Sequence, residues 1–191
     1  MGETETTDFL NGKVLIAMPG IGDPRFERSV IFICSHSDEG ALGLIVNRPA
    51  PGIGFGDLLG QLDIEEGSGA RQLRIMLGGP VERSRGFVLH SDDYVLAEAT
   101  LPVADGIGMT ASIDILRALA SGEGPEHAML ALGYSGWGPG QLEEEIRANG
   151  WITGEVDDGL IFGEDDAGKW SAALLRLGVD ASMLSRDGGM A

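Results

Sequence analysis

The stretch from Met18 to Pro49 constrains the fold most, because it holds two apolar runs on either side of a turn. The run Ser29–Ser35 is rich in β-branched residues, and Ala41–Val46 is again apolar before Pro49. Between them, Ser37-Asp38-Glu39-Gly40 has the composition of a tight turn. Proline cannot continue the ladder of a central strand, so Pro49 marks an end. The pattern predicts a β-hairpin.

Polar residues stand at the ends of the two predicted strands. They are Arg25, Arg28, His36, Asn47 and Arg48. We expect them to lie near one another at a strand end. Histidine titrates near neutral pH, and arginine binds carboxylate or phosphate with two parallel hydrogen bonds. This predicted cluster is the first candidate for a binding site, although its residues spell no known reaction.

The rest of the chain alternates short strands with amphipathic helices, which predicts an α+β fold rather than a regular βαβ series. Strands are expected at Lys13–Ala17, Leu73–Leu77, Gly86–His90, Val95–Leu101 and Ala128–Leu132. Helices are expected at Phe55–Leu62, at Thr110–Ala120 with Ser112 as its cap, from Pro139 to Asn149-Gly150, and at Lys169–Leu177.

The 191 residues, 43% of them hydrophobic, are enough to bury a sizeable core. No stretch is long enough, or rich enough in Pro, Gly or Ser, to be a linker. The weakest point, Glu65–Gly69, has the length of an ordinary loop. We therefore expect a single domain over residues 1–191, with short flexible tails at about 1–9 and about 187–191.

The formal net charge of −17 excludes several classes of partner. Nucleic-acid affinity comes mostly from Lys and Arg contacts to phosphate, and the 13 basic residues are scattered singly, so direct nucleic-acid binding is not expected. Anionic membrane surfaces are disfavoured for the same reason. Nine acidic residues and one basic residue, Arg147, lie between Gln141 and Ala167. This acidic stretch is either a solvated surface or a face for a basic partner.

The only cysteine, Cys34, excludes an internal disulfide, and no uninterrupted apolar run resembles a membrane span. The first dozen residues are acidic and polar, unlike a secretory signal. These features predict a cytoplasmic protein without membrane attachment.

Several near-motifs fail on their own chemistry. Ser135 lies between two glycines after a strand, but Trp137 stands where a nucleophile elbow needs glycine, and no histidine follows His127. Cys34 and His36 share a strand face but lie about 7 Å apart along it, so Cys34 is better explained as a buried apolar residue.

Cofactor and metal motifs are also missing. The set Cys34, His36, His90 and His127 has no ligand-pair spacing for a metal. The glycines from Gly52 to Gly56 do not complete a dinucleotide-binding loop, because Asp57 holds the last position. We expect no metal and no cofactor.

Aromatic residues are the remaining candidates for recognition. Tyr134 and Trp137 flank a connection between a strand and a helix. Trp137 either seals the edge of the core, which we favour because tryptophan is highly buried on average, or faces a partner.

Taken together, the motifs resemble a known family, AlgH/YqgE, also called UPF0301 or DUF179. The resemblance covers nearly the whole chain and rests on these segments in order: Leu15-Ile16-Ala17-Met18-Pro19; Asp23-Pro24-x-Phe26-x-Arg28-Ser29-Val30; His36-x-x-x-Gly40-Ala41-x-Gly43-x-x-x-Asn47-Arg48-Pro49; Gly78-Gly79-Pro80-Val81; Arg85 to His90; Leu132 to Ile146; and Trp170 to Asp180.

The resemblance implies an α+β fold in which a small closed β-barrel and a bifurcated sheet are surrounded by helices. Family members are often labelled transcriptional regulators, from one linked genetically to alginate production, and no catalytic residue carries over. The charge of −17 departs from what direct DNA reading requires. Regulation is therefore expected through a protein partner.

Two hypotheses follow for the function. In the first, which we favour, the chain is a non-enzymatic adaptor whose surface around Arg28, His36, Asn47 and Arg48 engages a protein or a small anionic ligand. In the second, it is an enzyme in which His36 or His90 acts as acid/base while Arg28 or Arg48 holds an anion. The purely structural alternative is that Asn47 caps a turn and Arg28 pairs with Glu27 or Asp23.

Overall fold

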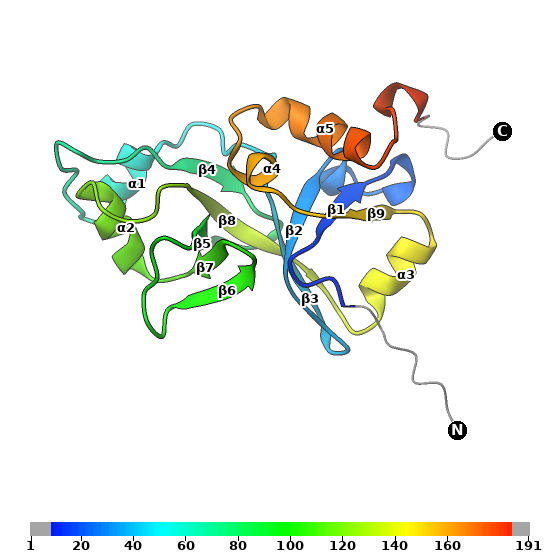
Figure 1. Cartoon of the computed structure of the whole chain (residues 1–191), viewed down its shortest axis with the longest axis horizontal. Coiled ribbons are helices and arrows are strands. Elements are labelled where there is room, and N and C mark those ends of the chain that lie inside the picture. Colours follow the sequence, from blue (N-terminus) through cyan, green and yellow to red (C-terminus); the bar gives the residue numbers. More distant parts are fainter. Residues whose placement is uncertain (1–8, 185–191) are drawn as a thin grey trace.

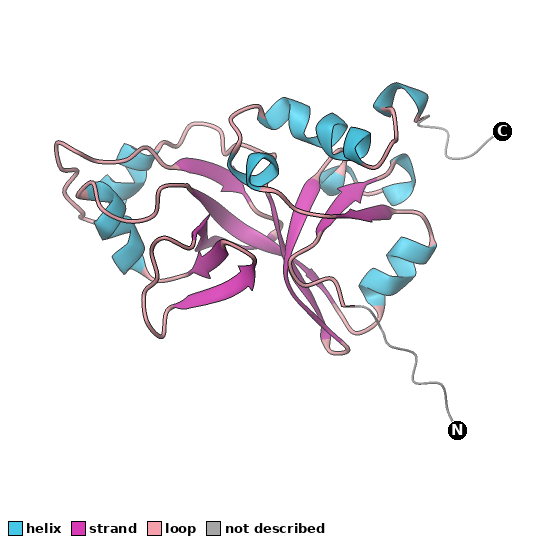
Figure 2. Ribbon diagram, viewed as in Figure 1, coloured by secondary structure: helices cyan, strands magenta, loops and turns pink. Residues whose placement is uncertain are grey.

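The computed structural model describes residues 9–184, in which all nine strands belong to one strongly curled sheet (Figures 1 and 2). Hydrogen-bonded neighbours follow the order β6-β7-β5-β8-β3-β2-β1-β9, and β4 pairs with β8 off this path. The strands are β1 (Val14–Ala17), β2 (Val30–Ser37), β3 (Gly40–Ile45), β4 (Arg74–Leu77), β5 (Val81–Ser91), β6 (Thr100–Ala104), β7 (Ile107–Thr110), β8 (Ala128–Trp137) and β9 (Trp151–Gly154).

Five α-helices lie outside the sheet in the described residues. They are α1 (Phe55–Gln61), α2 (Ile113–Ala120), α3 (Gln141–Arg147), α4 (Asp158–Phe162) and α5 (Lys169–Arg176). Helices α1 and α2 lie together at one end of the molecule, whereas α3 and α5 lie at the other (Figure 1). The short 3₁₀ turns η1 (Pro19–Ile21), η2 (Pro24–Phe26), η3 (Asp166–Gly168) and η4 (Ala181–Met183) complete the structure.

The long strand β8 joins the two ends. Its first half pairs in parallel with β4 and antiparallel with β5, and its last three residues pair with β3. Close approach at the changeover needs glycine: a Cβ on Gly78 would lie 2.3 Å from the carbonyl oxygen of Gly133, and one on Gly79 would lie 2.2 Å from Tyr134. The Gly78-Gly79 pair therefore lets one strand serve two parts of the sheet.

The expectation of a closed barrel is wrong. The sheet is a curled half-barrel, with β6 and β9 at the two ends of its path rather than paired with each other. Strand β8 pairs first with β4 and then, over its last three residues, with β3. The sheet therefore changes direction along β8 and does not close into a ring. Pro102, which cannot donate to a ladder, lies in the outer strand β6.

The predicted hairpin and principal helices are confirmed, and their ends differ from the predicted ones by a few residues at most. Ser112 caps α2 by accepting a hydrogen bond from the Asp114 N–H, although the helix begins at Ile113 rather than Thr110. The predicted strand Val95–Leu101 is wrong, because the Leu96 carbonyl accepts hydrogen bonds from the N–H groups of Ala99 and Thr100 in a turn, and β6 begins only at Thr100. Strands β7 and β9 and helix α4 were not predicted.

The core lies on both faces of the hairpin. Phe32 and Leu44 belong to the largest cluster, which packs against α4 and α5, whereas Ile31 and Ile45 belong to a cluster beneath α3. Burial on both faces explains why the strands read as nearly continuous apolar runs. The predicted tails fall on residues outside 9–184, apart from Phe9, whose ring packs edge-on against His36.

Candidate functional site

Four of the five polar residues predicted to cluster meet at one end of the hairpin, Arg25 through its backbone carbonyl oxygen, and His36 does not. Arg28, Asn47 and Arg48 lie together where β2 begins and β3 has ended. His36 lies near the turn, six residues beyond Val30, which is about 20 Å along a strand. The prediction of one five-residue cluster is therefore wrong for His36, because opposite ends of a hairpin cannot meet.

Asn47 fixes the backbone at this end of the hairpin. Its Oδ1 accepts a hydrogen bond from the N–H of Val30 at 2.9 Å, and its Nδ2 donates to the carbonyl oxygen of Arg28 at 2.9 Å. Arg28 has a φ of 56°, a left-handed conformation that non-glycine residues rarely adopt. The side chain of Asn47 thus holds Arg28 in a backbone conformation that would otherwise be unfavourable.

The side chain of Arg28 stacks on an immobilised aromatic ring. Its guanidinium carbon lies 5.2 Å from the centroid of the Trp170 ring. Trp170 is 8% exposed, and its Nε1–H donates to the carbonyl oxygen of Ala17 at 2.8 Å. No ion pair joins Arg28 to a carboxylate of residues 9–184. The stacking orients a positive charge that no carboxylate of the described residues pairs with.

Arg48 stabilises the loop before Arg28. Its guanidinium donates to the carbonyl oxygens of Arg25 and Glu27, the latter at 3.1 Å. Arg25 itself forms a pair with Asp23, whose pKa is lowered chiefly by that side-chain hydrogen bond. The alternative prediction that Arg28 pairs with Asp23 is therefore wrong, because Arg25 occupies that carboxylate.

Two adjoining cavities meet at Arg28. One, of about 290 Å³, is mostly apolar, and the other, of about 200 Å³, is mostly polar. Glu27, Arg28 and Trp170 line both. The apolar cavity includes Met18, Pro19, Ile21, Pro24, Ala181 and Leu184, and the polar cavity includes Asn47, Arg48, Asp166 and Ser171. We call this pair of cavities the Arg28 site.

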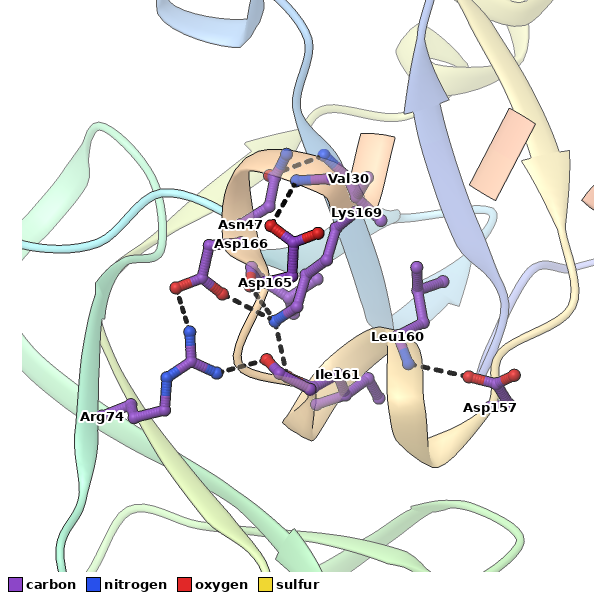
Figure 3. A network of polar contacts seen from close by, with 12 residues as sticks. Val30, Asn47, Arg74, Asp157, Leu160, Ile161, Asp165, Asp166 and Lys169 are labelled. Carbon is purple, nitrogen blue, oxygen red and sulfur yellow. Dashed lines mark hydrogen bonds and ion pairs between the residues drawn. The ribbon is translucent and has the colours of Figure 1, made fainter. Parts of the chain in front are cut away.

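A buried network around Lys169 includes Asp166 and Asn47, which also line the polar cavity (Figure 3). The Nζ of Lys169 donates to the carbonyl oxygens of Val46 and Ile161, each at 2.9 Å. It also lies 3.0 Å from Asp166 Oδ1 in an ion pair that lacks hydrogen-bond alignment. Arg74 pairs with the other oxygen of Asp166. Burial lowers the pKa of Lys169, against the effect of Asp166.

Sequence reasoning missed this network apart from Asn47. The sequence predicts Lys169 only as the start of a helix, yet it is 4% exposed and joins α5 to α4 and to Val46, which follows β3. The available signal was weak: three adjacent acidic residues, Glu164 to Asp166, precede a lysine at the start of an apolar helix face. Since Val46 lies 123 positions from Lys169 in the chain, only the tertiary structure brings the two together.

His36 is fully engaged at the turn end of the hairpin. Its Nδ1 accepts a hydrogen bond from the N–H of Leu10 at 3.0 Å, so Nε2 carries the proton and donates to Glu143 Oε1 at 2.5 Å. The side chain of Asn11 pairs with both backbone groups of His36. His36 therefore ties the segment before β1 and helix α3 to β2.

The other predicted residues have structural contacts. Trp137 is 8% exposed, and its Nε1–H donates to Glu145 Oε2 at 2.7 Å, which fits the favoured interpretation that it seals the core. Tyr134 is half-buried and packs edge-on against Phe87. Neither residue lines the cavities at Arg28.

Cys34 and the remaining histidine candidates do not form a reactive pair. Burial raises the pKa of the Cys34 thiol to about 12. A β-bulge lies between Ile33 and Ser35, so Cys34 packs in the main core while His36 contacts α3, and the prediction that they share a face is wrong. The ring nitrogens of the buried His90 face the Ser91 carbonyl oxygen and the Thr110 hydroxyl.

Within residues 9–184, no three His, Cys, Asp or Glu side chains are grouped closely enough to hold a metal ion. The same part of the chain contains no helix with the length and apolar character needed to cross a membrane.

Comparison with known proteins places these features in a family. The family model described as DUF179, AlgH-like, matches residues 14–182, which include the hairpin, Arg28, Asn47 and Trp170. The chain belongs to the AlgH-like family. UPF0301 proteins from Rhodopseudomonas palustris and Paracoccus denitrificans are 54% and 57% identical, covering 100% and 95% of this chain and 90% and 97% of their own lengths.

Solved structures agree with the AlgH-like fold. The solution structure of AlgH from Pseudomonas aeruginosa superposes with a TM-score of 0.78 at 38% identity and covers 100% of both chains. A Corynebacterium diphtheriae protein has a TM-score of 0.71 at 19% identity, covering 92% of this chain and 90% of its own, which shows the shared fold alone. The names of these proteins state no molecular activity.

Proposed function

We propose that this AlgH-like chain is a non-enzymatic binding protein that engages a protein partner through the Arg28 site. The observation that carries the proposal is the guanidinium of Arg28, stacked on Trp170 between two cavities and without a carboxylate partner in residues 9–184. Seven of the twelve Lys and Arg side chains within residues 9–184 form ion pairs with carboxylates, and Arg28 is not among them. A positioned cation without one is available to an anionic ligand.

The family resemblance implies a role in transcriptional regulation, and under this proposal the chain acts through a protein partner rather than by binding DNA. The net charge of −17 opposes phosphate-rich nucleic acid, since electrostatic attraction supplies most of its affinity. A protein partner that presents one local anion and an apolar group meets no such barrier at the Arg28 site. We place this binding in the cytoplasm as part of the same proposal.

The enzymatic alternative receives no support from the geometry. It requires His36 or His90 beside Arg28 or Arg48, as acid/base and anion holder. His36 lies at the opposite end of the hairpin, and His90 is buried with both ring nitrogens facing neighbouring oxygens. Neither imidazole lines the cavities at Arg28.

Affinity capture with matched variants tests the proposal. The wild-type chain, Arg28→Ala and Arg83→Ala are each used as bait in lysate of the source cell, and captured proteins are quantified by mass spectrometry. Arg83 is an exposed arginine of β5 that lines neither cavity, so it controls for loss of one charge. We expect a stoichiometric partner that Arg28→Ala loses at least tenfold and Arg83→Ala retains.

Two outcomes contradict the proposal. One is a partner retained equally by all three baits, which places binding elsewhere on the surface. The other is that no protein is captured in stoichiometric amounts by the wild-type chain. Circular dichroism and thermal unfolding of each bait establish that a loss of binding is not a loss of fold.

A further inference from the structure

We infer that the Arg28 site recognises the free carboxyl terminus of a partner chain whose last residue is apolar. The inference rests on the proposed function and names the chemistry of its ligand. It combines three features that meet at Arg28: one oriented guanidinium, one apolar cavity and one polar cavity.

The charge balance favours a monoanion such as a carboxylate. A guanidinium binds one carboxylate through two parallel N–H···O hydrogen bonds. Asp23 lines the apolar cavity, Asp166 the polar one and Glu27 both, so further negative charge on the ligand is repelled. Asp23 and Asp166 already pair with Arg25 and Arg74, which leaves Arg28 to meet the incoming anion.

The apolar cavity has room for a small hydrophobic group. Its volume of about 290 Å³ lies at the lower limit of ligand cavities, about 300–1,000 Å³. Met18, Ile21 and Leu184 contribute apolar surface, and Pro19 and Pro24 restrict the backbone of the 3₁₀ turns that form one wall. A carboxyl-terminal Leu, Ile, Met or Phe residue can place its side chain in this cavity and its carboxylate at Arg28 at the same time.

The polar cavity suits the peptide backbone that leads to that last residue. Ser171 and the carboxylate of Asp166 line it beside Arg28, and both have oxygens that accept hydrogen bonds from amide N–H groups. A free fatty acid has no such groups. A peptide therefore uses both cavities, whereas a simple apolar acid uses one.

The site is held in place before any ligand arrives. Asn47 fixes the backbone of Arg28, Trp170 orients its guanidinium, and Lys169 ties α5 to the carbonyl oxygen of Val46. Recognition by a prearranged group avoids the cost of ordering a flexible arginine on binding.

A library of peptides with free carboxyl termini tests the inference directly. Immobilised peptides randomised at the last four positions are probed with the full-length wild-type chain, Arg28→Ala and Arg83→Ala. We expect selected peptides to end in Leu, Ile, Met or Phe. In fluorescence polarisation, a labelled selected peptide should lose at least tenfold in affinity with Arg28→Ala and remain within twofold with Arg83→Ala.

Two further probes examine each half of the ligand. Amidation of the peptide's carboxyl terminus removes the anion and should weaken binding at least tenfold. Ala181→Met narrows the apolar cavity. It should weaken the binding of peptides that end in Phe more than the binding of peptides that end in Ala. Decanoate serves as the simple apolar acid and should compete at least tenfold less well than the free-carboxyl peptide.

The outcomes separate this inference from the proposed function. Failure to select carboxyl-terminal peptides, or equal binding of the amidated peptide, overturns the inference. If the affinity capture still yields a partner lost with Arg28→Ala, the proposed function stands and the partner binds through an internal segment. Stronger competition by decanoate than by the peptide overturns the inference in favour of a small-molecule acid.

Discussion

The two ends of the β2–β3 hairpin differ in how their polar groups are satisfied. At the turn end, His36 is 4% exposed, and both its ring nitrogens and its backbone groups have partners within the chain. At the other end, Asn47 holds the backbone carbonyl oxygen of Arg28, but within residues 9–184 its guanidinium stacks on an aromatic ring and pairs with no carboxylate. The same local pattern, polar residues at the ends of an apolar strand, serves stability at one end and is available for binding at the other.

The difference shows that the contacts of a polar residue at a strand end, rather than its residue type, indicate whether its role is structural or in binding. His36 is the residue best suited to acid/base chemistry, yet its contacts are those of a structural tie. Arg28, which sequence alone cannot distinguish from a solvated charge, keeps its guanidinium available in a fixed position. The predictions below test each side of this contrast.

Lys169→Ala should have the largest effect on stability. The substitution leaves the carbonyl oxygens of Val46 and Ile161 without their buried donor and removes one cation from Asp166. Breaking a buried charged contact in this way costs about 3–5 kcal/mol. Urea unfolding followed by circular dichroism measures it, with Lys13→Ala as the control, because its ion pair with Glu155 is exposed. A loss below about 1 kcal/mol contradicts a structural role for the network.

His36→Ala should have an intermediate effect. It leaves the N–H of Leu10 and the carboxylate of Glu143 without their partner, and unsatisfied buried groups cost about 1–3 kcal/mol. His127→Ala is the matched control, since that histidine is exposed, and it should change the free energy of unfolding by about 0.5 kcal/mol or less. Equal effects for the two variants would show that His36 is not a structural tie.

The turn end should also contribute to acid sensitivity. Burial favours the neutral form of Glu143, but hydrogen bonds from its own backbone N–H and from His36 outweigh it, so the pKa of Glu143 is lowered from 4.5. The unfolded chain then binds this proton more tightly than the folded chain, so stability is lost as pH falls below about 4.5. Glu143→Gln should therefore show a smaller decrease in urea midpoint between pH 5 and pH 3. An unchanged decrease contradicts this contribution.

Arg28→Ala should have the smallest effect on stability. The exposed side chain forms a stacking contact, and surface substitutions change the free energy of unfolding by about 0.5 kcal/mol or less. The same variant is expected to lose partner binding, so stability and binding separate at this residue. Thermal unfolding checks the first point, and a loss comparable to that of His36→Ala would assign Arg28 a structural role instead.

The parts of the fold that depend on local signals were predictable. The apolar runs and the turn composition gave the hairpin, and Ser112 gave the start of α2 within a few residues. Strand β7, by contrast, is only four residues long and holds Gly108, so its periodicity was too short to detect. The strand predicted at Val95–Leu101 fails because turn hydrogen bonds centred on Leu96 outcompete extended pairing.

The candidate site was predictable only in part. Arg28, Asn47 and Arg48 were predicted to gather because the start of one hairpin strand must lie beside the end of the other. His36 stands apart from them, because six residues along β2 separate it from Val30. Trp170, Asp166 and Lys169 could not be found in this way, because no local pattern tells which helix packs over a given strand end.

By itself, the sequence determined the elements and the family. Periodicity, turn residues and helix caps act over a few positions, so the hairpin and the main helices follow from their own segments, and the ordered motifs from Leu15 to Asp180 show the AlgH-like membership. Only the tertiary structure decided that the sheet stays open and that α5 brings Trp170 beneath Arg28. The reason is that these contacts join segments far apart in the sequence, such as Arg28 and Trp170 or β3 and β8, whose meeting depends on how the whole core packs.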